Sequence, residues 1–217
     1  MYKFYLVVVL SLFIALLSRG QSTYKQIITK FTEIDFPSKP VFFDTLGIQT
    51  YRYSNSTADY LVAVRDMTKL EGFHLKSEDL QDFYKGMEES TLEGDNGKLI
   101  SKKLFLIGGF TGLEMVYKGS HPNMPELKFK RAIILNGIVV SVDFMTSSEN
   151  EQKTKLDRES FFNSFAITGD RKNLTQETIN PNHSSTNSFA YRLGKLTGYI
   201  LIILFVIWVF RKLRRKK

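Results

Sequence analysis

The side chains that could do acid–base or metal chemistry in this sequence are scattered. The three histidines, His74, His121 and His183, lack the i, i+4 spacing that places two imidazoles on one helix face to bind zinc. The chain contains no cysteine, which excludes disulfides, thiolate zinc sites and cysteine nucleophiles together. From these residue types we expect no metal site and no cofactor.

Two motifs typical of nucleotide-binding proteins and hydrolases are also missing. The glycine-rich segment at residues 108–112 is not followed by the Gly-Lys-Ser/Thr of a phosphate-binding loop, so a turn between two strands explains it better. No Gly-x-Ser-x-Gly elbow occurs, which removes one common serine-hydrolase signature, while a dispersed catalytic triad stays open as an alternative. We therefore expect a protein that is not an enzyme, with no catalytic or cofactor-binding residue.

Carboxylates are plentiful, and they fall into two groups. Glu114 and Asp143 lie within apolar strand sequence, where a buried ionised carboxylate needs a partner. Arg131 is their neighbour if the strands pair as expected, which favours a structural network over an active site. The second group surrounds the end of a predicted helix and lacks the pattern of an EF-hand, so we expect solvated surface, with weak cation binding as the alternative. Its members are Glu88, Glu89, Glu93 and Asp95.

Hydrophobic periodicity predicts the elements that position these residues. Apolar side chains at i, i+3, i+4 and i+7 predict a helix over residues 77–94. A closing helix over residues 149–165 carries three phenylalanines that we expect to dock on a sheet. β-Branched and aromatic stretches predict strands at residues 27–34, 41–43, 48–53, 60–67, 98–107, 110–117, 127–135 and 138–145.

The clearest local signal is the pair Asn136-Gly137, because both residues tolerate the positive φ angles of a type I′ hairpin turn. In the strand that follows, Ile138, Val140 and Val142 alternate with mixed residues. One face of this strand is therefore expected in the core, and the other is expected to be partly covered or wet.

Hydrophobic segments at the two ends predict the topology. Residues 6–17 form an apolar core followed by small residues near Gly20, which is the layout of a signal peptide over residues 1–20; an uncleaved signal anchor is the alternative. The apolar run at residues 196–210 precedes a tail in which six of seven residues are basic. We expect an ectodomain at residues 21–170, a flexible polar stalk at 171–191, a transmembrane helix at 192–210 and a basic cytoplasmic tail at 211–217.

The formal net charge of +8 comes from the two ends of the chain. Residues 21–189 hold 20 of the 30 Lys and Arg and all 22 Asp and Glu, so their net charge is −2. The basic character is therefore a topology signal, and we expect no nucleic acid as a partner. It predicts a single-pass protein of the cell membrane with its C-terminus in the cytoplasm and its ectodomain periplasmic or extracellular.

In its order of motifs the sequence resembles the Mog1/PsbP-like superfamily, as a bacterial exported member with a C-terminal membrane anchor. The resemblance covers residues 24–169 and rests on Phe36-Pro-Ser-Lys-Pro40, Gly109-Phe-Thr-Gly-Leu-Glu114, the strand pair around Asn136-Gly137, and Phe161-Phe-Asn-Ser-Phe165. It implies an α+β fold with an antiparallel β-sheet flanked by helices, and binding or assembly roles rather than chemistry. No catalytic residue carries over, and the membrane tail departs from the soluble family members.

These features together predict a membrane-tethered, non-catalytic binding or assembly module outside the cytoplasmic membrane, with an envelope or membrane protein as its partner. The alternative is a carrier or sensor of a small apolar ligand or lipid, because the chain contains 18 Phe and 10 Tyr. An enzyme of unknown class is the third reading.

Overall fold

The computed structural model describes residues 23–69, 80–121, 124–176 and 189–199. The predicted signal peptide, the predicted membrane helix beyond residue 199 and the basic tail lie outside these ranges. Among the residues that are described, no helix is both long enough and apolar enough to cross a membrane.

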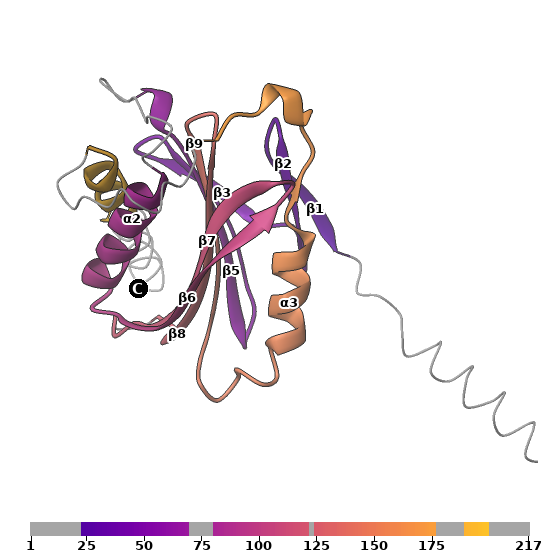
Figure 1. Cartoon of the computed structure of the whole chain (residues 1–217). Helices are drawn as coiled ribbons and strands as arrows, with labels where there is room; N and C mark the ends of the chain where they lie inside the picture. Colours follow the sequence, from indigo (N-terminus) through magenta and orange to yellow (C-terminus); the bar gives the residue numbers. More distant parts are fainter. Residues whose placement is uncertain (1–22, 70–79, 122–123, 177–188, 200–217) are drawn as a thin grey trace, which may run out of the picture.

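The expected α+β class, with antiparallel sheets flanked by helices, is confirmed (Figure 1). The main sheet has the order β3-β4-β5-β9-β8-β7-β6, and a smaller one has the order β1-β2-β10. The strands of the main sheet are β3 (Val41–Thr45), β4 (Ile48–Ser54), β5 (Ala58–Asp66), β6 (Lys98–Ile107), β7 (Phe110–Lys118), β8 (Leu127–Leu135) and β9 (Ile138–Thr146). The remaining elements are β1 (Tyr24–Thr29), β2 (Thr32–Phe36), β10 (Ala166–Ile167), the helices α2 (Leu80–Gly94) and α3 (Lys155–Ser164), and the 3-10 turns η1 (Met67–Lys69) and η2 (Arg171–Asn173).

The strand predicted at residues 27–34 is wrong, because the chain reverses there and forms the β1–β2 hairpin. Lys30 and Phe31 make the turn, and the Phe31 N–H donates to the Thr29 hydroxyl at 3.2 Å. The stretch contains no glycine or proline, so it carried no ordinary turn signal. The helix α3 also begins later than predicted, because turns occupy residues 148–154.

The β8–β9 hairpin sets which side chains share a face of the main sheet. Asn136 and Gly137 have φ angles of 50° and 71°, as the predicted type I′ turn requires. The turn pairs Leu135 with Ile138, and this register continues along both strands. Because side chains alternate along a strand, the register assigns every residue of this pair to one of the two faces.

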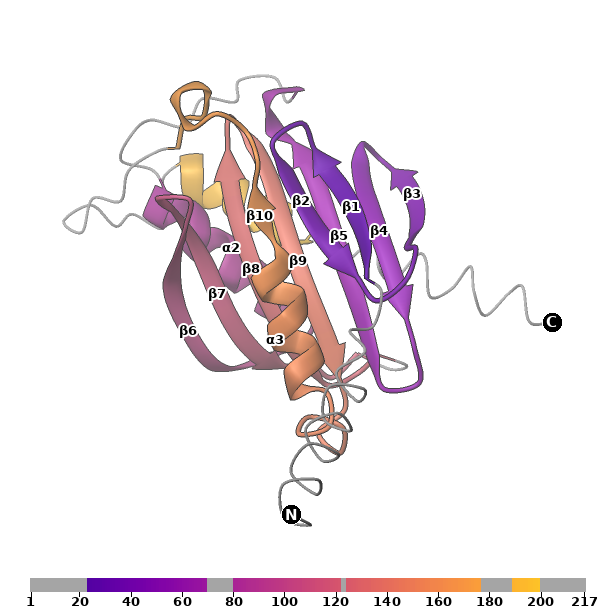
Figure 2. The same ribbon diagram turned by 90° about the vertical axis from the view of Figure 1, so that its right-hand side faces the viewer.

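The two faces of the main sheet are covered differently (Figures 1 and 2). The first face, which bears Phe129 and Phe144, packs against α3 and the smaller sheet. Tyr60 lies at the centre of this core, with its ring centroid 5.0 Å from Phe144 and 5.1 Å from Phe161 of α3. The second face packs against α2 over β7 and β8.

A helix formed by residues 189–199 lies beside α2 (Figures 1 and 2). Three glycines lie in the contact, Gly86 of α2 with Gly194 and Gly198. A Cβ atom at Gly194 would overlap the carbonyl oxygen of Phe83, so the two backbones touch directly. Glycines four residues apart permit such an approach. The end of the predicted stalk and the first residues of the predicted membrane helix therefore lie against the domain.

Residues 171–176, at the start of the predicted stalk, also contact the sheet. The Thr175 N–H donates to the Asn136 side chain at 2.6 Å. The Gln176 side chain donates to the main-chain oxygens of Thr111 at 2.8 Å and Ile134 at 3.0 Å. These bonds extend the folded domain to residue 176.

Candidate functional site

A groove of about 270 Å³ lies on the first face of the sheet, beside α3. Figure 2 shows α3 lying over the strands, with β7 and β6 to one side of it. The strands β7 and β8 supply four of the lining residues and α3 supplies the other four: Glu114, Val116, Phe129, Arg131, Arg158, Glu159, Phe162 and Asn163. Small-molecule pockets usually measure about 300–1,000 Å³, so this groove suits a side chain or a short segment.

Two arginine–phenylalanine pairs join α3 to β8, and the arginine comes from α3 in one pair and from β8 in the other. Arg158 of α3 lies over the ring of Phe129, 3.8 Å from its centroid. Arg131 of β8 lies over the ring of Phe162 at 4.8 Å. Because residues two apart on a strand or four apart on a helix share a face, both pairs point into one interface. Stacking on an aromatic ring also restrains each guanidinium plane.

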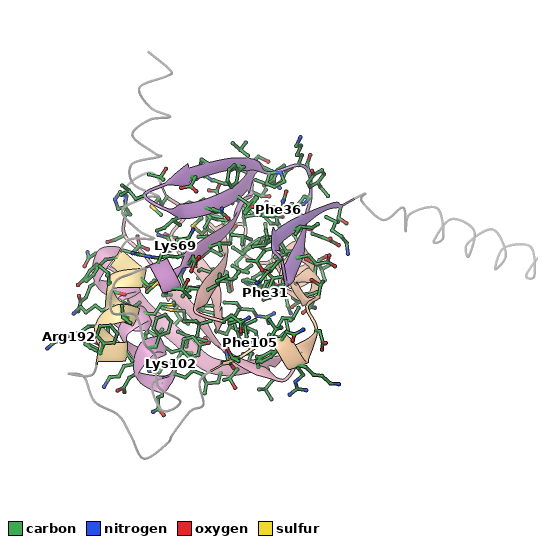
Figure 3. All side chains as sticks on the ribbon, turned by 90° about the horizontal axis from the view of Figure 1, so that it is seen from above. Phe31, Phe36, Lys69, Lys102, Phe105 and Arg192 are labelled. Carbon is green, nitrogen blue, oxygen red and sulfur yellow. The ribbon has the colours of Figure 1, made fainter. Side chains whose placement is uncertain are left out.

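The charge of Arg131 is neutralised within the fold. Its Nε donates to Glu114 at 2.7 Å, and its Nη1 donates to the main-chain oxygen of Phe162 at 3.2 Å. Lys103 of β6 approaches the same carboxylate at 3.0 Å. Burial alone would raise the pKa of Glu114, but the hydrogen bonds from Arg131 and Lys103 outweigh it and lower that pKa. Phe105, labelled in Figure 3, adds a second ring 5.1 Å from this guanidinium.

Arg158 makes the same kind of stacking contact, but within the part of the chain that the structure describes no carboxylate pairs with it. Its Nη1 is buried and has no hydrogen-bond partner among the described residues. Glu159, the adjacent acid on α3, is half-exposed and faces Lys155 at 4.0 Å. Arg158 as a whole is only partly buried, so the rest of its guanidinium, which has no carboxylate among the described residues, is accessible above the aromatic ring of Phe129. This arrangement is suited to binding an anion.

A second group of buried charges lies on the second face of the sheet. Lys130 contacts Asp143 at 2.5 Å and donates to the Ser141 hydroxyl at 2.8 Å. Ser141 in turn donates to Asp143 at 2.7 Å. Lys128 pairs with Asp95, the residue directly after α2. Burial lowers the pKa of Lys128, and the nearby Asp95 carboxylate opposes this shift.

A cavity of about 50 Å³ adjoins these charges, lined in part by Tyr117, Lys128 and Met145. A water position needs about 10–15 Å³ of such space, so the cavity has room for a few water molecules but not for an acyl chain. Burial also raises the pKa of the Tyr117 phenol well above its usual value. Because both lysines have carboxylate partners, we assign this second group to the stability of the fold.

The structure separates the carboxylates that the sequence grouped. Glu114 and Arg131 pair as predicted, but Asp143 points to the opposite face and pairs with a lysine there. Glu88 and Asp95 are 8% and 2% exposed, so the prediction of solvated surface is wrong for these two. The reason is that α2 turns this side toward the sheet, where lysines of β6 and β8 neutralise both carboxylates. Figure 3 labels the first of them, Lys102 of β6.

The other two acids of that group face the helix of residues 189–199. Glu89 accepts a hydrogen bond from Tyr191, and Glu93 pairs with Lys195 at 2.9 Å. Of the three histidines, only His121 lies within the described ranges. In those ranges no three His, Cys, Asp or Glu side chains are grouped closely enough to hold a metal ion.

Sequence reasoning missed Arg158 and the two buried lysines of β8. The lysines carried a usable signal, because the Asn136–Gly137 turn alone places Lys130 opposite Asp143. Arg158 carried none, since its contact with Phe129 depends on how α3 docks. The glycine-rich segment behaved as predicted: Gly108 and Gly109 form the turn between β6 and β7.

Comparison with known proteins gives a limited likeness. No protein-family model matches the chain. No curated protein matches it either. The solution structure of cyanobacterial PsbP (CyanoP) from Synechocystis sp. PCC 6803 is similar at a TM-score of 0.48 and 16% identity, over 69% of this chain and 95% of that one. A protein of unknown function, PA94 from Pseudomonas aeruginosa, is similar at a TM-score of 0.43 and 10% identity, over 68% of this chain and 99% of that one. At these values the likeness carries no inference about activity or partners.

Proposed function

We propose that this protein is a membrane-tethered, non-catalytic binding or assembly module displayed outside the cytoplasmic membrane, and that it holds a partner protein at the groove beside α3. The observation that carries the proposal is the uncompensated guanidinium of Arg158. It is held over Phe129 at 3.8 Å, with Nη1 buried and without a partner among the described residues. A charged donor fixed in this way loses little freedom when a ligand binds.

The surroundings of the groove support binding rather than catalysis. Glu114 is kept ionised by Arg131 and Lys103, because their hydrogen bonds lower its pKa. A general acid or base instead needs a pKa near the working pH. The groove residues also lie on a helix and on strands of a seven-stranded sheet, so their positions are rigid. The wider Mog1/PsbP-like assignment and the membrane anchor belong to the same proposal and rest on the sequence.

Site-directed photocrosslinking in native membranes tests the proposal. A photoreactive phenylalanine analogue would replace Asn163, which is exposed at the rim of the groove, in the full-length protein. The matched control places the same group at Lys39, an exposed residue of the loop between β2 and β3. We expect a discrete crosslinked product from position 163 alone, and its loss on Arg158→Ala. Identical patterns from both positions, or no product from either, would refute the proposed binding site.

The carrier of an apolar ligand remains the second candidate function. The aromatic residues that motivated it largely fill the core of the first face, including Phe36, Tyr60, Phe144 and Phe161. Native mass spectrometry of the detergent-extracted protein distinguishes the two functions, because a carrier should retain a co-purifying lipid and a binding module should not.

A further inference from the structure

We propose that the groove recognises a carboxylate, presented by an acidic side chain of an extended segment of the partner protein. This inference rests on the proposed function as a binding module and names the chemistry of the partner at that same groove.

The first argument is a comparison of two arginines within one interface. Arg131 and Arg158 both stack on a phenylalanine ring, at 4.8 Å and 3.8 Å. Arg131 also receives a carboxylate, that of Glu114, at 2.7 Å from its Nε. Arg158 has no ion pair within the described part of the chain, and its Nη1 is buried without an acceptor there. The group that is present at one arginine and absent at the other is a carboxylate.

The second argument is the charge of the groove. Its lining holds Arg131, Arg158, Glu114 and Glu159, while Lys103 pairs with Glu114 and Lys155 pairs with Glu159. These four cations exceed the two carboxylates by two charges. Charge complementarity therefore favours an anion at the groove, and the comparison of the two arginines identifies it as a carboxylate.

The third argument concerns what carries the carboxylate. Val116, Phe129 and Phe162 give the groove an apolar part next to the guanidinium. The volume of about 270 Å³ accommodates an acidic side chain with an apolar neighbour, which a peptide segment supplies. Asn163 lines the same groove and is exposed, so its amide is available to the main chain of such a segment.

The experiment is a nuclear magnetic resonance titration of the full-length protein in detergent micelles. The probes are the amidated peptide acetyl-Gly-Phe-Glu-Gly, the same peptide with Gln in place of Glu, and the same peptide with phosphoserine in place of Glu. The readout is the Nε–H signal of Arg158, which is assigned by its absence in Arg158→Met. This variant keeps an apolar stem over Phe129, and a thermal melt verifies that it is folded.

We expect the Glu peptide to shift this signal at millimolar concentration and to bind at least about 10-fold more tightly than the Gln peptide, because a charged hydrogen bond is lost in the latter. Backbone shifts of the groove should disappear in Arg158→Met and persist in Lys153→Ala, which changes an exposed residue outside the groove. Equal binding of the Glu and Gln peptides, no shift with either, or tighter binding of the phosphoserine peptide would overturn the inference. A crosslink from position 163 combined with any of these outcomes would leave the proposed function standing and remove only its carboxylate chemistry.

Discussion

Replacing Asp95 by Asn would leave the ammonium of Lys128 buried without its carboxylate. The two side chains are 1% and 3% exposed, so bulk solvent does not reach the pair, and the adjoining cavity has room for only a few water molecules in place of the lost carboxylate. Removing one member of a buried ion pair typically costs about 3–5 kcal/mol. This cost has an upper limit, because Lys128 can lose its proton instead of staying charged without a partner. Deprotonating a lysine of ordinary pKa 10.5 at pH 7 costs about 1.4 kcal/mol per pKa unit, so the destabilisation cannot exceed roughly 5 kcal/mol. We therefore expect Asp95→Asn to lower the free energy of unfolding by about 3–5 kcal/mol at pH 7.

The loss of unfolding free energy in Asp95→Asn, called the deficit below, should also depend on pH in a defined direction. When the pKa of a folded lysine is below its unfolded value, the unfolded chain binds more protons, and stability rises with pH in that window. The deficit of Asp95→Asn should therefore shrink as the pH is raised from neutral toward the ordinary pKa of Lys128. In contrast, removal of an exposed partner should give a small deficit with no such alkaline recovery.

Urea unfolding of the full-length protein in non-ionic micelles, followed by far-ultraviolet circular dichroism, measures both effects. The control is Glu33→Gln, which breaks the exposed pair with Lys25, 2.7 Å apart, and should lower the free energy of unfolding far less, because solvent screens this pair. The double variant Asp95→Leu with Lys128→Met should regain most of the loss, because no buried charge remains. A deficit for Asp95→Asn no larger than that of Glu33→Gln would refute the assignment of this pair as a buried structural contact.

Three further predictions concern pH, docking and topology. The pKa of Glu114 is lowered in the fold, so the ionised carboxylate stabilises the protein above the ordinary pKa of 4.5, and this stabilisation is lost as the pH falls through the lowered pKa. Urea unfolding should therefore show that Glu114→Gln destabilises the protein at about pH 7 and much less at about pH 3. In Gly194→Ala the new Cβ overlaps the carbonyl oxygen of Phe83, so residues 189–199 should become sensitive to limited proteolysis. The control Arg192→Ala changes an exposed side chain of the same helix and should not alter the digestion. Equal digestion of both variants would contradict the close contact. Protease added to intact spheroplasts should digest the domain and spare a tag placed after Lys217, and the opposite pattern would refute the proposed orientation.

The parts of the fold that could be predicted are those specified by short-range chemistry. The turn at Asn136 and Gly137 needs positive φ angles that few other residue pairs tolerate, so it identified the β8–β9 hairpin, whose register the structure then gives. The helix α2 ends at Gly94 as predicted, because glycine favours the end of a helix. The strands β6 and β8 also have their predicted bounds, since each is a continuous β-type stretch between turn residues.

The remaining features depend on packing between elements that are distant in the sequence. Phe31 occupies a turn without glycine or proline because its ring is buried in the core of the first face. Asp95 is buried because α2 rests on β8, where a lysine 33 residues further along the chain neutralises it. Arg158 reaches Phe129 only once α3 has docked. Candidate site residues of this kind have no local pattern, because the partner that defines their role is supplied by tertiary structure.

The close contact between α2 and residues 189–199 places a constraint on the proposed anchor. The eleven residues 200–210 that follow this helix would reach roughly 16 Å at about 1.5 Å per residue, about half of a hydrocarbon layer of ~30 Å. A complete crossing therefore also needs residues 192–199, and the face of this helix that packs on α2 is not available to lipid chains while the contact lasts. Under the proposed topology, docking and full insertion compete for the same eight residues, so the thickness of the bilayer would influence how firmly the domain is held.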